Sequence, residues 1–176
     1  MTCDSLNEKC RIVFIISILT TALPRLVFSE EPVQFTDPNL QIVVENTLGI
    51  LQPTPTDMLE LISLDAKGTN ITNLIGIEYA MNLTRLNLID NEIQDISVLG
   101  HLRNLRDLLL PQNQISDISG LSNLTNLETI WLGRNQIKEI TVLGGLINLK
   151  QLLLFQNQIN DISALSNLMN LETLSL

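Results

Sequence analysis

The sequence predicts an α/β repeat solenoid, in which short strands of successive coils stack into one parallel sheet. Three observations predict it. A repeat of 22 residues covers most of the chain, leucine and isoleucine fill its regular positions, and a helical pattern precedes it. Apolar residues make up 45% of the 176 residues but aromatic residues only 3%, so leucine and isoleucine must fill the core. This bias is typical of a core in which similar side chains stack.

The repeat is regular enough to be aligned on itself. Four complete copies follow one another without a gap, over residues 83–104, 105–126, 127–148 and 149–170. Each copy fits L-x-x-[LI]-x-L-x-x-N-x-I-x-[DE]-I-[ST]-x-L-x-x-L-x-N, apart from small or apolar replacements. A more divergent copy spans residues 61–82, and a sixth begins at Leu171. We therefore expect residues 61–176 to form five repeats and the start of a sixth, without a C-terminal cap.

The spacing of apolar residues within one copy predicts a strand followed by a return segment. Ile130 and Leu132 are two residues apart, so on a strand both point into the core. Apolar side chains of the same copy then recur every three residues, at Ile137, Ile140, Leu143 and Leu146. A period of three suits a 3₁₀-like or extended return on the opposite side of the coil. One copy cannot bury its own apolar face, but stacked copies share a core.

Two polar positions of the repeat have structural interpretations. The ninth position holds Asn91, Asn113, Asn135 and Asn157, where the strand turns. A stacked column of asparagine amides can satisfy backbone groups of neighbouring coils. The thirteenth position holds Asp95, Asp117, Glu139 and Asp161, and we favour local capping of the next turn over calcium binding.

Residues 30–60 predict a helical N-terminal cap for the first coil. Asp37 resembles a helix N-cap and Pro38 occupies the first helical position. Apolar residues then follow at helical spacing until Pro53 and Pro55 end the run. Thr56 is expected to cap a second short helix.

The repeat also resembles a known family. The 22-residue pattern, the repeated N-x-I-x-D-I-S and the lead-in LDAKGTNITNLIGIEYAMNL are similar to those of the bacterial internalin family of leucine-rich-repeat proteins. The resemblance implies a right-handed horseshoe, with the parallel sheet on its concave face and a helical N-terminal cap. It also implies that the concave face binds a protein ligand. No immunoglobulin-like domain, wall-sorting signal or C-terminal cap follows the repeats, so we expect a fragment, a truncated product or one part of a larger assembly.

Residues 1–29 predict an export signal. Lys9 and Arg11 precede an apolar run of about ten residues, shorter than the roughly twenty that span a membrane. Arg25 near the expected cleavage point leaves an uncleaved anchor as an alternative. Both cysteines, Cys3 and Cys10, fall in this segment, so the mature chain would hold no disulfide and no thiolate metal site.

Composition and motifs exclude several classes of function. The net charge of −9 and a pI near 4.4 argue against a nucleic-acid partner and against an anionic membrane surface. We also expect no membrane insertion of the mature chain. The sequence holds no phosphate-binding loop, nucleophile elbow or clustered metal ligands, so we expect no cofactor, no metal and no enzymatic activity. The single histidine, His101, falls at a variable position and is expected to be solvated.

Strand alternation predicts the ligand-binding residues. The third, fifth and seventh positions of each copy should face the concave side, where Leu109, Trp131 and Leu153 form one apolar column. An exposed column with the single tryptophan of the chain and a polar rim is a marker of an interface. The candidate ligand-binding residues are Arg85, Ile89, Asp107, Leu109, Trp131, Gln151, Leu153 and Phe155.

The expected function is therefore that of a secreted or surface module that binds a protein ligand. Two alternatives stay open: an intracellular regulatory scaffold, and the repeat portion of a larger protein whose active domain lies elsewhere. The open C-terminal edge, with Leu174 and Leu176, is a further place where pairing with another chain is expected.

Overall fold

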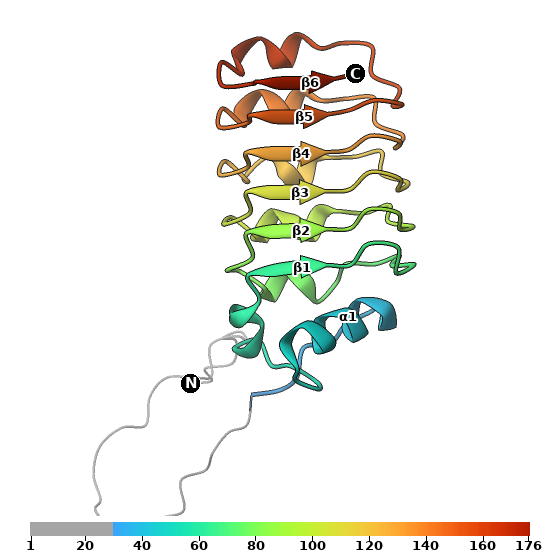
Figure 1. Ribbon diagram of the computed structural model, residues 1–176, viewed down its shortest axis with the longest axis vertical. Coiled ribbons are helices and arrows are strands. Elements are labelled where there is room, and N and C mark those ends of the chain that lie inside the picture. Colours follow the sequence, from blue (N-terminus) through green and yellow to red (C-terminus); the bar gives the residue numbers. More distant parts are fainter. Residues whose placement is uncertain (1–29) are drawn as a thin grey trace, which may run out of the picture.

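The computed structural model describes residues 30–176 as a stack of coils (Figure 1). The predicted export signal lies outside the described residues. Six strands pair in sequence order into one open parallel sheet. These strands are β1 (Ser63–Asp65), β2 (Arg85–Asn87), β3 (Asp107–Leu109), β4 (Thr129–Trp131), β5 (Gln151–Leu153) and β6 (Thr173–Ser175). The predicted repeat solenoid is confirmed. Within residues 30–176, no helix has the length and apolarity needed to cross a membrane.

The strand register follows the 22-residue repeat without a slip. Leu86 pairs with Leu108, and Leu108 pairs with Ile130, so equivalent residues of successive copies are direct neighbours. In the five copies from Leu61 to Asn170, the fourth and sixth positions point into the solenoid and are at most 1% exposed, as Ile130 and Leu132 show. They belong to a core that runs from the N-terminal helix to the last coils. A one-residue slip would turn these side chains outward, so the apolar pattern fixes the register.

The return segments are short 3₁₀ helices, as the three-residue spacing predicts. They are η2 (Ile77–Tyr79), η3 (Ser97–His101), η4 (Ser119–Leu121), η5 (Thr141–Gly145) and η6 (Ser163–Asn167). Their first turns are capped by the column of acidic residues: Ser97, Ser119 and Ser163 each donate a backbone N–H to the aspartate two residues earlier, at 2.8 Å. The predicted local capping is confirmed for Asp95, Asp117 and Asp161. The same backbone bonds, from Ser97 and Ser163, lower the pKa of Asp95 and of Asp161.

The asparagine column joins the coils, as predicted. The Asn113 amide donates to the backbone oxygens of Leu88 (2.9 Å) and Leu110 (3.0 Å), and its oxygen accepts from Ile93 N (3.0 Å). Asn91 and Asn135 repeat this pattern in their own coils. Each asparagine therefore satisfies buried backbone groups of its own coil and of the coil before it.

The eighth position of each copy turns the chain away from the sheet through a left-handed backbone. Asp90, Gln112, Arg134 and Gln156 have φ between 56° and 60°. Their side chains connect coil to coil: Arg134 Nε donates to Gln156 Oε1 at 2.8 Å, and Gln112 Nε2 donates to Asp90 Oδ1 at 3.3 Å. The turn is strained for residues other than glycine, and these bonds between coils offset part of that cost.

Helix α1 (Pro38–Leu48) packs against the first coil at the N-terminal end of the stack (Figure 1). Leu40 and Val44 of this helix are fully buried in the shared core. Asp37 is the N-cap, as predicted, and its Oδ1 accepts from Asn39 N and Leu40 N. Its Oδ2 accepts from the backbone N–H groups of Thr72 and Asn73 in the first coil, which the sequence did not predict.

The second predicted helix differs from expectation. It is a single 3₁₀ turn, η1 (Asp57–Glu60), and Thr56 makes no side-chain capping bond. Thr54 and Asp57 cap each other instead: Asp57 Oδ2 accepts from Thr54 N at 2.8 Å, and Thr54 Oγ1 accepts from Asp57 N at 3.2 Å. The reciprocal pair provides acceptors for two backbone N–H groups, those of Thr54 and Asp57.

The last described coil keeps part of its core positions accessible. Leu174 is 44% exposed and Leu176 is 57% exposed. A groove at this end is lined by Leu154, Ile159, Ile162 and Leu176, with Gln156 and Asn157 at its border. The pairing of this edge with another chain stays a prediction.

Candidate ligand-binding face

The third, fifth and seventh positions of each copy lie on the face of the sheet that points away from the core. Leu108 and Leu110 belong to the core, whereas Leu109 between them does not. The predicted alternation therefore holds, and we call this surface the sheet face. The sheet face is the side of the stack on which the candidate residues lie.

The predicted apolar column exists in the register of the sheet. Leu109 pairs with Trp131 and Trp131 pairs with Leu153. Its exposure differs from expectation, because Leu109 keeps only 5% of its accessible surface. Side chains on adjacent strands stand about 4.8 Å apart, so Asn87 on one side and the large indole of Trp131 on the other leave Leu109 little room. Trp131 and Leu153 are half-buried, and the accessible part of the column lies on these two side chains.

Trp131 is half-buried, but its polar atom is not accessible. Among the described residues, its indole Nε1 is the buried side-chain polar atom that has no hydrogen-bond partner. A buried donor without an acceptor costs free energy, because its bond to water is lost and not replaced. Sequence reasoning placed Trp131 on this face but could not predict that its nitrogen would be covered.

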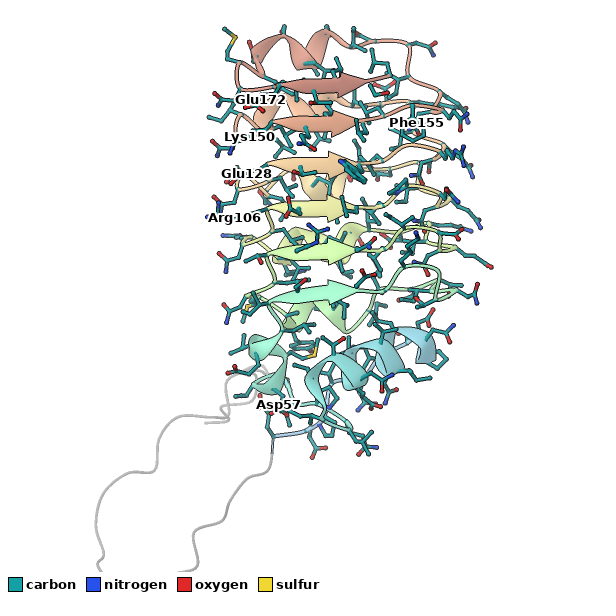
Figure 2. The ribbon with its side chains drawn as sticks, in the orientation of Figure 1. Asp57, Arg106, Glu128, Lys150, Phe155 and Glu172 are labelled. Atoms are coloured by element: carbon teal, nitrogen blue, oxygen red, sulfur yellow. The ribbon has the colours of Figure 1, made fainter. Side chains whose placement is uncertain are left out.

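Phe155 lies in a niche that a glycine provides. A Cβ atom at position 133 would stand 2.5 Å from Cε1 and Cζ of the Phe155 ring. The ring therefore occupies the volume in which a side chain at position 133 would begin. Figure 2 shows Phe155 near the ends of the strands where the chain leaves the sheet. The signal in the sequence is the absence of a side chain at the seventh position of one copy, where other copies carry Ile89 or Pro111.

The polar rim contains the predicted ion pair. Arg85 Nη1 lies 3.5 Å from Asp107 Oδ2 across β2 and β3, and the side chains are 53% and 34% exposed. An exposed pair of this kind contributes only about 0–1 kcal/mol to stability. Gln151 is exposed on β5, and Ile89 is half-buried on the coil of β2. Ile89 is separated from Phe155 by the buried Pro111 and Gly133, so it does not extend the patch around the indole.

The N-terminal part of the sheet face is a closed polar network. Asn87 Nδ2 donates to Asp65 Oδ1 at 3.1 Å, and Asn87 Oδ1 accepts from Ile89 N at 3.2 Å. Asp65 Oδ1 also accepts from Lys67 N. Asp65 and Asn87 are thus bonded within the first two coils, whereas the coils of β3 to β5 present apolar side chains and an unpartnered donor.

A ladder of charges at the second position of the last four copies was missed by sequence reasoning. Its members lie one above another along the edge where the strands begin, across the sheet from Phe155 (Figure 2). They are Arg106, Glu128, Lys150 and Glu172. Glu128 contacts Arg106 Nη1 at 2.6 Å and Lys150 Nζ at 2.5 Å. The hydrogen bonds from Lys150 and then from Arg106 lower the pKa of Glu128, and Glu128 raises the pKa of Lys150. The alternation of sign at this position was the available signal, and the two ion pairs of Glu128 connect three successive coils.

His101 and the aspartates of the acidic column make local hydrogen bonds. His101 is exposed, and its Nδ1 lies 3.0 Å from the Val98 backbone oxygen. Over residues 30–176 no group of three or more His, Cys, Asp or Glu side chains gathers at metal-binding distance.

These features define the class of the protein. The family model for leucine-rich repeats, in two copies, matches residues 103–145. The chain is a leucine-rich-repeat solenoid. A search of curated protein sequences gave no match.

Similar solved structures narrow the class. The internalin InlF from Listeria monocytogenes is 33% identical with a TM-score of 0.79, over 85% of this chain and 46% of that chain. Internalin C2 from the same species is 26% identical with a TM-score of 0.50, over 83% of this chain and 97% of that one. The ectodomain of an Arabidopsis thaliana receptor kinase, solved with Casparian strip integrity factor 2, is 27% identical with a TM-score of 0.52, over 57% and 13%. The chain is an internalin-like leucine-rich-repeat protein, and it spans less than half of the InlF chain.

Proposed function

We propose that this protein is a secreted or surface recognition module that binds a protein ligand on its sheet face, the face expected to be concave. Leucine-rich-repeat domains are protein-interaction modules, and solenoids of this type offer extended binding surfaces. The single observation that carries the proposal is the apolar column with Trp131 at its centre and a polar rim at Arg85, Asp107 and Gln151. Nothing about the core requires apolar side chains at these positions, because they point away from it.

The composition of the patch favours a protein as the ligand. Aromatic side chains surrounded by polar residues are typical of the energetic centres of protein interfaces. The net charge of −9 disfavours nucleic acid, whose phosphates require a basic surface. Asp65 and Asn87 of the first two coils bond to one another, and the apolar area lies on the coils of β3 to β5.

Substitution of Trp131 tests the proposal. We expect Trp131→Ala to weaken binding of the partner by about tenfold to several hundredfold, the range for an aromatic residue at the centre of an interface. Wild-type and variant proteins are used as parallel baits for an extracellular or cell-surface extract, and the retained partner is then titrated against both. His101→Ala, an exposed side chain away from the sheet face, is the matched control and should bind as the wild type does.

The thermal midpoint of the same variants separates binding from folding. Trp131 stands outside the core cluster, so its removal should shift the midpoint far less than removal of a core leucine. Equal binding by Trp131→Ala and wild type would place the ligand on another surface. A collapse of stability would show instead that the indole is a structural element.

The extracellular location is a separate part of the proposal. It rests on the predicted export signal over residues 1–29. Protein sequencing of the N-terminus is expected to give a mature chain that begins near Glu30 in the culture medium or at the cell surface. Recovery of the intact N-terminus from a cytoplasmic fraction would favour the regulatory-scaffold alternative.

A further inference from the structure

The aromatic pair on the sheet face has an arrangement that folding of the solenoid does not require. Gly133 has no positive φ, unlike Gly49, Gly68 and Gly76, so its backbone would accept a side chain. What excludes a side chain is the Phe155 ring, which stands 2.5 Å from the place of its Cβ. Glycine at position 133 is therefore needed because the Phe155 ring approaches closely, and not because the backbone conformation requires it.

The ring and the indole are neighbours on the same face. Trp131 and Gly133 are two positions apart in one extended segment, so their outward directions coincide at a separation of about 6.6 Å. A ring seated over Gly133 from the next coil thus lies beside the indole. Phe155 is half-buried and lies two residues beyond the end of β5, just before the turn, so it is less enclosed than a core residue.

The indole nitrogen is the polar group that this arrangement leaves without a partner. The buried amides of Asn91, Asn113 and Asn135 all donate and accept within the chain. Trp131 Nε1 does neither, although the tryptophan N–H is a donor that usually finds an acceptor when buried. The candidate binding face therefore contains one buried N–H donor, that of the Trp131 indole, without an acceptor.

We infer that Phe155 is a displaceable cover over the Trp131 indole, and that the ligand is an extended polypeptide segment that replaces it. An apolar side chain of the ligand takes the niche above Gly133, and a carbonyl oxygen of its backbone accepts from Nε1. This inference rests on the proposed function of the sheet face. The displaced ring then packs on the outer side of the bound segment.

The surroundings of the indole select a neutral carbonyl over a charged group. Leu109 and Leu153 flank the indole on the neighbouring strands, so an acceptor there is surrounded by apolar atoms. A carboxylate in such a place would need a cation, and Arg85 on β2 is already paired with Asp107. An amide carbonyl with an adjacent aliphatic side chain fits both requirements, and a polypeptide supplies the two together.

The tryptophan of this chain is single, so its indole N–H gives one cross-peak in a nitrogen–proton correlation spectrum. We expect Phe155→Ala to speed the exchange of this proton with deuterated solvent by at least about tenfold, because the covered donor becomes accessible. Gly133→Ala should give the same result without deletion of the ring, since the new Cβ displaces it. Ile89→Ala, at the equivalent position two coils away, is the matched control and should leave the rate unchanged.

N-methylacetamide is the probe for the acceptor. In Phe155→Ala we expect a saturable downfield shift of the indole peak as this amide is added, and in the wild type a shift only at several-fold higher concentration. Unchanged exchange in both Phe155→Ala and Gly133→Ala would overturn the cover. Faster exchange without a shift on adding the amide would overturn the role of the nitrogen as a donor to a carbonyl.

Both readouts are made without the natural partner, so they are independent of partner binding. Loss of partner binding in Trp131→Ala together with unchanged exchange would retain the proposed function and reject the cover. Suppose instead that the exchange is rapid, the shift is saturable and Trp131→Ala still binds the partner fully. The covering of the indole by Phe155 would then stand, but the proposed binding of the partner at this place would be rejected. A thermal melt of each variant confirms that the fold is kept before its exchange rate is compared.

Discussion

Replacement of Asn113 by alanine is expected to lower the free energy of unfolding by about 3–5 kcal/mol, a severe loss for one substitution. The side chain is 8% exposed and lies between coils. Its amide donates to the backbone oxygens of Leu88 and Leu110, and its oxygen accepts from Ile93 N. Alanine would leave Ile93 N buried and unpaired, at about 1–3 kcal/mol. It would also remove one of the two side-chain donors to each of the Leu88 and Leu110 oxygens, at about 0.5–1.5 kcal/mol each, because these oxygens still accept from Asn91 and Asn135. Urea unfolding followed by circular dichroism measures the loss.

The matched control is an asparagine that also joins two coils but lies at the surface. Asn126 Nδ2 donates to the Arg103 backbone oxygen at 2.9 Å, and the side chain is exposed. Water replaces this bond when the amide is removed, so Asn126→Ala should cost less than about 1 kcal/mol. If the two variants lose similar stability, burial is not what makes the ninth-position column important.

The sequence predicted the fold well because one repeat constrains every coil at once. The 22-residue spacing brings Leu86, Leu108 and Ile130 into register, and a shift by one residue would expose all of them. The roles of Asn113 and Asp95 were predictable for the same reason, since their bonds lie within a coil or between coils of known offset. The short 3₁₀ returns follow from the three-residue apolar spacing.

Features that depend on side-chain size or on contacts outside the repeat were not predictable. Alternation placed Leu109 on the sheet face, but its loss of exposure comes from its neighbours, which alternation does not describe. The niche at Gly133 depends on which way the Phe155 ring leans from the next coil. The bond from Asp37 to Thr72 spans 35 residues and joins the helical segment to the repeats. No period in the sequence relates those two segments.

Asp37→Asn is the second substitution with a large expected effect. Asparagine is as good an N-cap as aspartate, so Oδ1 can still accept from Asn39 N and Leu40 N. The new Nδ2 group, however, is a donor and would face the N–H groups of Thr72 and Asn73, which now donate to Oδ2 at 2.7 and 3.2 Å. We expect a loss of about 2–4 kcal/mol, because charge-assisted bonds are removed and buried donors stay unpaired.

Asp161→Asn is the control, since Asp161 makes only a local cap to Ser163 N and is exposed. It should lose less than about 1 kcal/mol. Comparable losses in the two variants would show that Asp37 acts only as a helix cap, and that its bonds to the first coil contribute little.

The pH dependence of the Asp37→Asn difference provides a further test. Burial, the largest single influence, raises the pKa of Asp37, but the hydrogen bonds from Thr72, Asn39 and Asn73 together exceed it, and the pKa is lowered. A carboxylate whose pKa is lower in the folded state stabilises the fold above its unfolded pKa, about 3.9. This contribution is lost as the pH falls through the folded pKa. The stability gap between wild type and Asp37→Asn should therefore be constant near neutral pH and shrink below about pH 4. Other carboxylates titrate alike in both proteins, so a gap that is flat or widens in acid would mean that the Asp37 charge does not join α1 to the first coil.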